Sequence, residues 1–261
     1  MKVLFASDLD KTLIHFQRSD IPMGGLVETE RTSHGFSVMS ASAYNNLRYI
    51  QEETLFVPTT TRSMKQYGRI KQFKENPPKY AVLCNGGKIF TNGTYLSEWD
   101  DYVAERSKSC STKEEVFATF ERHFRSELLP EMQFTDDLFW YLKLVETADV
   151  SLFQDLVMED IRKLGWVPYV QGKKVFALPA HIDKGEAIRF LIDKENINFT
   201  IAAGDSTMDD TLLKVADLGI VPAHGEIRSL PHSTQYKCTV QSGIYATDEI
   251  LEIVKSAIKN A

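Results

Sequence analysis

The chain has 261 residues, of which 43% are hydrophobic and 25% are charged, a composition typical of globular proteins with a full hydrophobic core. Its formal net charge of -6, with Lys and Arg scattered along the chain, argues against nucleic-acid binding. No apolar run approaches the ~20 residues that span a bilayer, so we expect no membrane association.

The three cysteines, Cys84, Cys110 and Cys238, lie far apart and form no CxxC pair. This spacing predicts neither a disulfide framework nor a zinc site. The apolar start of the chain is also too short for a signal-peptide core. We therefore expect a reduced, cytoplasmic protein.

The first strand is predicted at residues 3–6, an unbroken apolar run typical of a strand buried on both faces of a parallel sheet. Asp8 and Asp10 follow at a spacing that projects both carboxylates from one side of an extended backbone. Two acids that close repel each other unless a cation lies between them or one is protonated. Ligands bind at such strand ends in open α/β sheets, although a simple Asx turn remains the alternative.

Residues 15–37 are polar and glycine-containing, and they favour a β-hairpin flap and a solvated loop about equally. A helix follows at residues 43–50. A second apolar run at 54–58 leads into Thr59 to Ser63 and a helix predicted at 64–73. A strand that ends in hydroxyls before a helix can bind an anion, but helix N-capping explains the same residues.

A third strand is predicted at residues 80–84, and the composition changes beyond it. Residues 87–180 contain all three tryptophans, a capping box at Thr112 and Glu115, and helical and strand periodicity in turn. We predict an α+β domain at 87–180 that interrupts a parallel-sheet domain formed by 1–86 and 181–261. The aromatic residues are expected to form its core.

The parallel-sheet domain resumes with a capping box at Asp183 and Glu186, which places Lys184 in the first turn of a helix. A lysine there opposes the helix dipole, which indicates a nearby anion or simply a solvated surface. A buried-type strand at 199–203 then breaks at Gly204 and is followed by Asp205, Asp209 and Asp210. A closing helix is predicted at 248–258.

Four strand or helix ends thus carry polar groups, and together they resemble the haloacid dehalogenase (HAD) superfamily. Asp8 to Leu13 matches its DxDxTL motif, Thr60 to Arg62 stands at its TGR motif, Lys184-Gly185 at its KG motif and Gly204 to Asp209 at its GDSxxD motif. The order and spacing are similar to those of Cof-like and sucrose-phosphatase-like phosphatases with a C2-type cap. The resemblance implies a Rossmann-like α/β core with an inserted cap.

The resemblance also implies a mechanism. Asp8 is expected to attack phosphorus and form an aspartyl-phosphate, and Asp10 to act as general acid and then base. Thr60 and Lys184 are expected to contact the phosphate. Magnesium is expected on Asp8, the Asp10 carbonyl and Asp205, with Asp209 orienting Lys184 or a metal-bound water; oxygen ligands favour magnesium over zinc.

The substrate is expected to be a small phosphorylated metabolite, most plausibly a sugar or polyol phosphate, contacted by Thr12, Thr61, Arg62 and Asn85. Thr61 stands where the group has Gly, and Met208 where it often has Asn. Two alternatives remain: a phosphomutase with the same machinery, and a metabolite-binding protein of low turnover. Nothing in the sequence fixes the oligomeric state.

Overall fold

The computed structural model describes residues 1–17, 24–123, 131–145 and 150–261, which form two compact units. The first unit comprises Met1–Leu96 and Asp183–Ala261, and the second comprises Ser97–Ile182. The inserted domain was predicted at 87–180. The difference at the first boundary arises because β7 (Lys88–Thr91) and β8 (Thr94–Tyr95) form an antiparallel sheet with β6 (Tyr80–Leu83).

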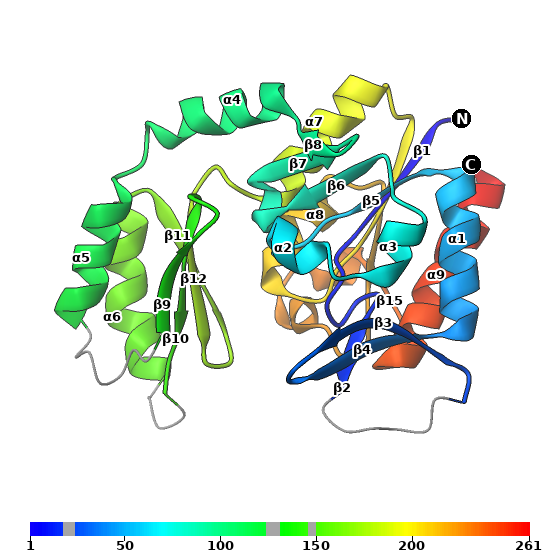
Figure 1. Cartoon of the computed structure of the whole chain (residues 1–261), viewed down its shortest axis with the longest axis horizontal. Coiled ribbons are helices and arrows are strands. Elements are labelled where there is room, and N and C mark those ends of the chain that lie inside the picture. Colours follow the sequence, from blue (N-terminus) through cyan, green and yellow to red (C-terminus); the bar gives the residue numbers. More distant parts are fainter. Residues whose placement is uncertain (18–23, 124–130, 146–149) are drawn as a thin grey trace. The chain divides into compact units, whose positions relative to one another are not determined.

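A five-stranded parallel sheet forms the centre of the first unit, as predicted (Figure 1). Its strand order is β15-β14-β13-β1-β5, with bounds β1 Val3–Ser7, β5 Leu55–Pro58, β13 Phe199–Ala203, β14 Leu218–Val221 and β15 Lys237–Cys238. Every residue of β1 is buried, which confirms that this apolar run lies between two covering layers. β6 continues the edge beside β5 through a parallel bridge between Thr59 and Val82.

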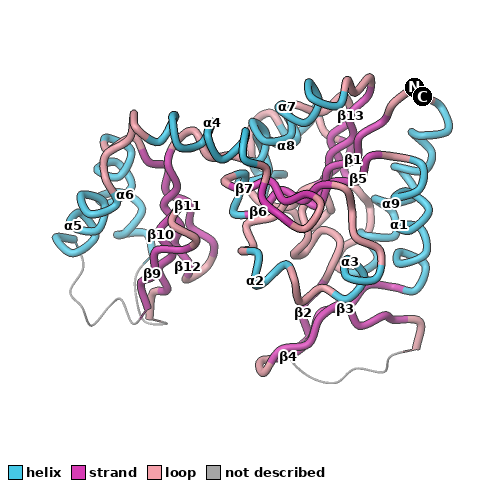
Figure 2. Tube along the Cα trace, turned by 45° about the horizontal axis from the view of Figure 1, so that its top comes forward, coloured by secondary structure: helices cyan, strands magenta, loops and turns pink. Residues whose placement is uncertain are grey.

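Helices cover both faces of this sheet. In Figures 1 and 2, α1 (Ala41–Glu53) and α9 (Ile244–Asn260) lie together on one face, and α7 (Lys184–Glu195) and α8 (Asp210–Lys214) lie on the other. The first unit also contains short 3-10 helices: η1 Cys84–Gly86, η3 Thr207–Asp209, η4 Glu226–Ser229 and η5 Ser233–Gln235.

The helix predicted at 64–73 is wrong as a single element. The structure has α2 at Met64–Tyr67 and α3 at Lys71–Glu75. Gly68 ends α2, and Ile70, with an extended backbone, precedes α3. Glycine is a poor helix former, which explains why α2 ends at Gly68. The apolar spacing that predicted a single helix continues past this break.

The polar stretch after Asp10 forms a small antiparallel sheet, so the hairpin is the correct one of the two interpretations. Its order is β2-β4-β3, with bounds β2 His15–Gln17, β3 Leu26–Thr32 and β4 Gly35–Ser40. Residues 18–23 of the predicted flap lie outside the described residues.

The second unit is an α+β domain, as predicted. An antiparallel sheet of order β11-β12-β10-β9 packs with helices around a hydrophobic core that is mostly aliphatic and includes the aromatic residues Phe120 and Trp166. Its elements are α4 Ser97–Ser107, α5 Lys113–His123, β9 Glu131–Thr135, β10 Phe139–Lys143, α6 Val150–Lys163, β11 Trp166–Gln171 and β12 Lys174–Pro179. No helix in the described ranges is long and apolar enough to cross a membrane.

Candidate active site

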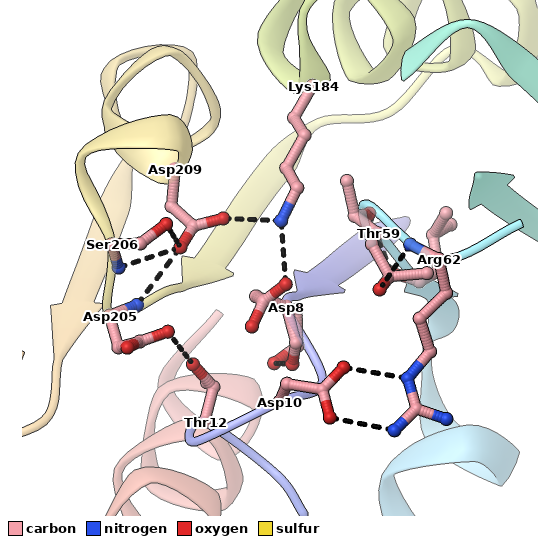
Figure 3. Close-up of polar contacts among 12 residues, drawn as sticks. Asp8, Asp10, Thr12, Thr59, Arg62, Lys184, Asp205, Ser206 and Asp209 are labelled. Carbon is pink, nitrogen blue, oxygen red and sulfur yellow. Dashed lines mark hydrogen bonds and ion pairs between the residues drawn. The ribbon is translucent and has the colours of Figure 1, made fainter. Parts of the chain in front are cut away.

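The parallel sheet brings the predicted site residues to one edge. Asp8 directly follows β1, Asp205 lies two residues beyond β13, and Thr60 lies two residues beyond β5. Because β13, β1 and β5 are neighbours and parallel, their carboxyl ends carry these three residues side by side. Lys184, the first residue of α7, reaches the same place (Figure 3).

Three buried carboxylates form the centre of the site. Asp8, Asp205 and Asp209 each offer an oxygen, and these oxygens all lie within 4.8 Å of one another. The Lys184 ammonium lies between two of them, 2.6 Å from Asp8 Oδ1 and 2.5 Å from Asp209 Oδ1, and its side chain is only 1% exposed. Three carboxylates and one ammonium leave two formal negative charges.

This charge and donor set fit a divalent cation with a preference for hard oxygen ligands, which magnesium satisfies. Without an ion, burial and the neighbouring acids raise the pKa values of Asp8 and Asp205. Burial raises the pKa of Asp8 to about 7, with Asp209 and Asp10 adding to the shift and Lys184 opposing it. Burial raises the pKa of Asp205 to about 8, with repulsion from Asp8 and Asp209 as the next causes.

Lys184 stays charged in this setting. Burial lowers its pKa, but the opposite charges of Asp209 and Asp8, and the hydrogen bonds to them, outweigh this and raise the pKa above its usual value. The lysine that the sequence placed against the helix dipole is therefore a buried cation with two anionic partners. A solvated surface position, the alternative interpretation, is wrong.

Asp209 also shapes the loop that carries Asp205. Its Oδ2 accepts hydrogen bonds from Asp205 N at 3.1 Å, Ser206 N at 2.9 Å and Ser206 Oγ at 3.0 Å. Gly204 makes this approach possible, because a Cβ there would lie 2.4 Å from Asp209 Cβ. The other oxygen of Asp209, Oδ1, accepts a hydrogen bond from the Lys184 ammonium at 2.5 Å.

A glycine is needed at position 185 for a similar steric reason. A Cβ at this position would lie 2.4 Å from the carbonyl oxygen of Thr211. Glycine therefore lets the first turn of α7 contact the start of α8, which brings Lys184 and Asp209 together.

Thr60 and Asn85 lie on adjacent loops, joined by a hydrogen bond from Asn85 N to the Thr60 carbonyl at 3.0 Å. The Thr60 hydroxyl accepts from Arg62 N at 3.2 Å, which leaves its own proton available for another acceptor. Asn85 has a left-handed backbone (φ 57°), and both polar atoms of its buried side chain lack a hydrogen-bond partner among the described residues. Such a group indicates an absent ligand atom or water.

Asp10 and Arg62 bind each other. Arg62 Nε and Nη2 each lie 2.7 Å from one oxygen of the Asp10 carboxylate, in a bidentate pair (Figure 3). The carboxylate of Asp10 is thus outside the group of three acids. Arg62, expected to contact substrate, has its guanidinium engaged by Asp10 and by Glu30 of β3.

The remaining expected residues have different surroundings. Thr12 is fully buried, and its hydroxyl donates to Asp205 Oδ1 at 3.4 Å. Thr61 is partly exposed. Asp210 is separate from the three-acid group and accepts from His232 at 2.7 Å and from Tyr236 at 3.0 Å.

Two residues of this network were missed from the sequence. Ser206 has a usable local signal, because Ser206 and Asp209 have the spacing of a capping box, which the structure contains. Glu30 has no local sequence signal, because it reaches Arg62 only when the hairpin is folded.

A family model described as sucrose-6F-phosphate phosphohydrolase matches residues 1–249. Among curated protein sequences, none matches this chain.

Several solved structures share the fold. The sucrose-phosphatase of Synechocystis, solved with sucrose and phosphate, has a TM-score of 0.73 at 19% identity, with 99% of each chain covered. The HAD subclass IIB sugar phosphatase BT4131 has a TM-score of 0.68 at 13% identity, with 99% of this chain and 100% of the other covered. A Thermoplasma acidophilum protein has a TM-score of 0.66 at 15% identity, with 98% and 99% covered.

The solved structures identify the fold of this chain as that of the HAD superfamily, with an additional antiparallel-sheet unit. The family model extends over almost the whole sequence, including all four motif positions. The chain therefore belongs to the sucrose-6F-phosphate phosphohydrolase family of HAD phosphatases.

Proposed function

We propose that this chain hydrolyses a phosphorylated sugar in a magnesium-dependent reaction that passes through an aspartyl-phosphate on Asp8. The observation that carries the proposal is the group of Asp8, Asp205 and Asp209 around Lys184, with two formal negative charges in excess. The family to which the chain belongs supports the sugar phosphate as substrate.

Asp8 is the nucleophile of this proposal. Lys184 binds its Oδ1, which orients the carboxylate and leaves the other oxygen to attack phosphorus. A bond forms between this oxygen and phosphorus, and the bond from phosphorus to the sugar oxygen breaks. Water then attacks the phosphorus of the aspartyl-phosphate and releases inorganic phosphate and the free carboxylate.

Asp10 is the general acid and then the general base of this proposal. A sugar alkoxide is a poor leaving group, so it needs a proton as its bond to phosphorus breaks, and we assign that donation to Asp10. The ionised Asp10 then removes a proton from the attacking water. Its partly exposed carboxylate, two residues from Asp8, suits exchange of protons with substrate and water.

Magnesium would be held by the carboxylates of Asp8 and Asp205 and the backbone carbonyl of Asp10. When bound, it supplies positive charge that allows the anionic nucleophile to approach an anionic phosphate. Asp209 keeps Asp205 and Lys184 in place through the hydrogen bonds described above.

Thr60 and Asn85 are proposed to bind the substrate. The free proton of the Thr60 hydroxyl is available for a phosphate oxygen, and the unpartnered Asn85 amide can both donate to and accept from a substrate group. Thr12, Thr61 and Arg62 were also expected at the substrate. Of these, Thr61 has a partly exposed side chain, whereas Thr12 and Arg62 act through Asp205 and Asp10.

We also propose that the protein acts in the cytoplasm. No disulfide joins Cys84, Cys110 and Cys238 in the structure, which agrees with a reducing compartment.

The test is phosphate release from a panel of sugar monophosphates, including sucrose phosphate, with magnesium or with EDTA. We expect activity with magnesium, loss in EDTA, and loss in Asp8→Asn. Asp210→Asn is the matched control, because Asp210 follows Asp209 directly at the start of α8 but binds His232 and Tyr236 instead of the three-acid group. Full activity of Asp8→Asn would refute the proposal.

A further inference from the structure

Glu30 is a buried carboxylate that lies outside the three-acid group. Its side chain is only 5% exposed, and a charge so placed is costly unless it is paired. Glu30 Oε2 accepts from Arg62 Nη1 at 2.7 Å, and Arg69 Nη1 lies 3.7 Å from Oε1. Its partners are therefore the arginine that binds Asp10 and a second arginine.

A β-bulge places Glu30 in this position. The pairing of β3 with β4 shifts between Glu28, opposite Val38, and Glu30, opposite Ser37. Thr29 and Glu30 are consecutive and both buried, which the regular alternation of a strand does not give. Bulges redirect side chains in this way and are frequent beside active sites.

Arg62 connects Glu30 to Asp10 through a rigid group. Its planar guanidinium uses Nε and Nη2 for Asp10 and Nη1 for Glu30. Because the guanidinium is a fixed fork, fixing its plane at one end also fixes the donors at the other end. Hydrogen bonds from Arg62 N to Thr60 Oγ1 and from Cys84 N to the Arg62 carbonyl hold the arginine backbone.

Asp10 depends on this fork for its orientation. Its side chain is 48% exposed, so packing restrains it little. Among the described residues, its carboxylate accepts hydrogen bonds only from Arg62. A small movement of the guanidinium would therefore move the carboxylate.

We infer that Glu30 is a positioning residue for the proton transfer by Asp10, acting through Arg62; this rests on the role of Asp10 in the proposed function. Removing the Glu30 charge releases one end of the guanidinium, and the general acid loses its alignment with the leaving oxygen. The effect is confined to reactions in which the leaving group needs a proton.

The test compares two aryl esters of similar size: phenyl phosphate, whose leaving phenoxide is strongly basic, and dinitrophenyl phosphate, whose leaving group departs without a proton. The parameter to be measured is kcat/KM, because it depends only on the steps up to and including cleavage of the first P–O bond. Glu30→Gln keeps the shape of the side chain and removes its charge. We expect about a tenfold loss with phenyl phosphate, a part of what a general acid contributes, and less than about a twofold loss with dinitrophenyl phosphate.

Arg62→Lys provides a second variant, since it keeps the charge and removes the fork. It should show the same dependence on the leaving group, and adding Glu30→Gln to it should cause no further loss, because both act through one contact. Glu28→Gln is the matched control: Glu28 belongs to the same strand but binds Arg31 and Lys71, and we expect no dependence on the leaving group.

Asp10→Asn separates this inference from the proposed function. If Asp10→Asn shows the leaving-group dependence and Glu30→Gln lowers both substrates equally or neither, the inference is overturned and the proposed function stands. If Asp10→Asn itself shows no such dependence, the role of Asp10 fails and the inference fails with it.

Discussion

Raising the pH should destabilise the magnesium-free protein, because two acids of the site have a higher pKa in the folded state than in the unfolded chain. Burial raises the pKa of Asp8 from 3.8 to about 7 and that of Asp205 from 3.8 to about 8. At a pH between 3.8 and about 7, the native state keeps a proton that the unfolded state has released. The free energy of unfolding therefore falls as the pH rises through this window, and the contribution is lost above about pH 8.

The size of the effect follows from the shift. Three pKa units correspond to about 4 kcal/mol. Asp8 and Asp205 raise each other's pKa, so we count this interval once for the pair. For a protein of this length, about 4 kcal/mol lowers the melting temperature by about 10 °C.

The assay is thermal unfolding in EDTA between about pH 5 and pH 9, followed by circular dichroism, and then repeated with saturating magnesium. Magnesium binds the ionised acids of the folded state and should abolish most of the decrease. Asp205→Asn removes one of the repelling charges and should flatten the pH dependence in EDTA, whereas Asp210→Asn should leave it unchanged. A melting temperature that is constant or rises from pH 5 to pH 9 in EDTA would refute the reasoning.

Three further predictions concern single residues. Lys184→Met leaves Asp8 and Asp209 without their cation, so kcat should fall by at least about a hundredfold in a phosphate-release assay. Gly204→Ala forces a methyl group against Asp209 and should lower both stability, by about 1–3 kcal/mol in urea unfolding, and magnesium affinity in calorimetry. Asn85→Gly removes the amide and accepts the left-handed backbone at this position, so it should raise KM for the sugar phosphate with little change in the melting temperature. A large drop in stability would show that the amide is structural.

The sequence placed Asp8 and Asp205 at strand ends correctly because the signals for those strands are local. An apolar run that ends in acids specifies a buried strand and the group at its end, and this holds for β1 with Asp8 and for β13 with Asp205. The neighbouring order of these strands was implied only by the resemblance to a family. The structure gives the physical link, since parallel pairing of β13 with β1 brings the two acids together.

What the sequence missed depends on contacts between distant segments. Glu28 and Glu30 look alike in the sequence, and only the register shift of β3 against β4 separates their roles. The engagement of Arg62 by two carboxylates likewise needs the hairpin in place. The break between α2 and α3 was missed because apolar spacing was given more weight than the glycine.

The proposed reaction requires that Asp8 becomes covalently phosphorylated during turnover. Borohydride reduces an aspartyl-phosphate to homoserine, so peptide mass spectrometry after a borohydride quench reports the modified position. We predict homoserine at position 8 only when both a sugar phosphate substrate and magnesium are present, and none when the carboxylate is replaced in Asp8→Asn. Continued turnover with an unmodified Asp8 under the same quench would contradict the account.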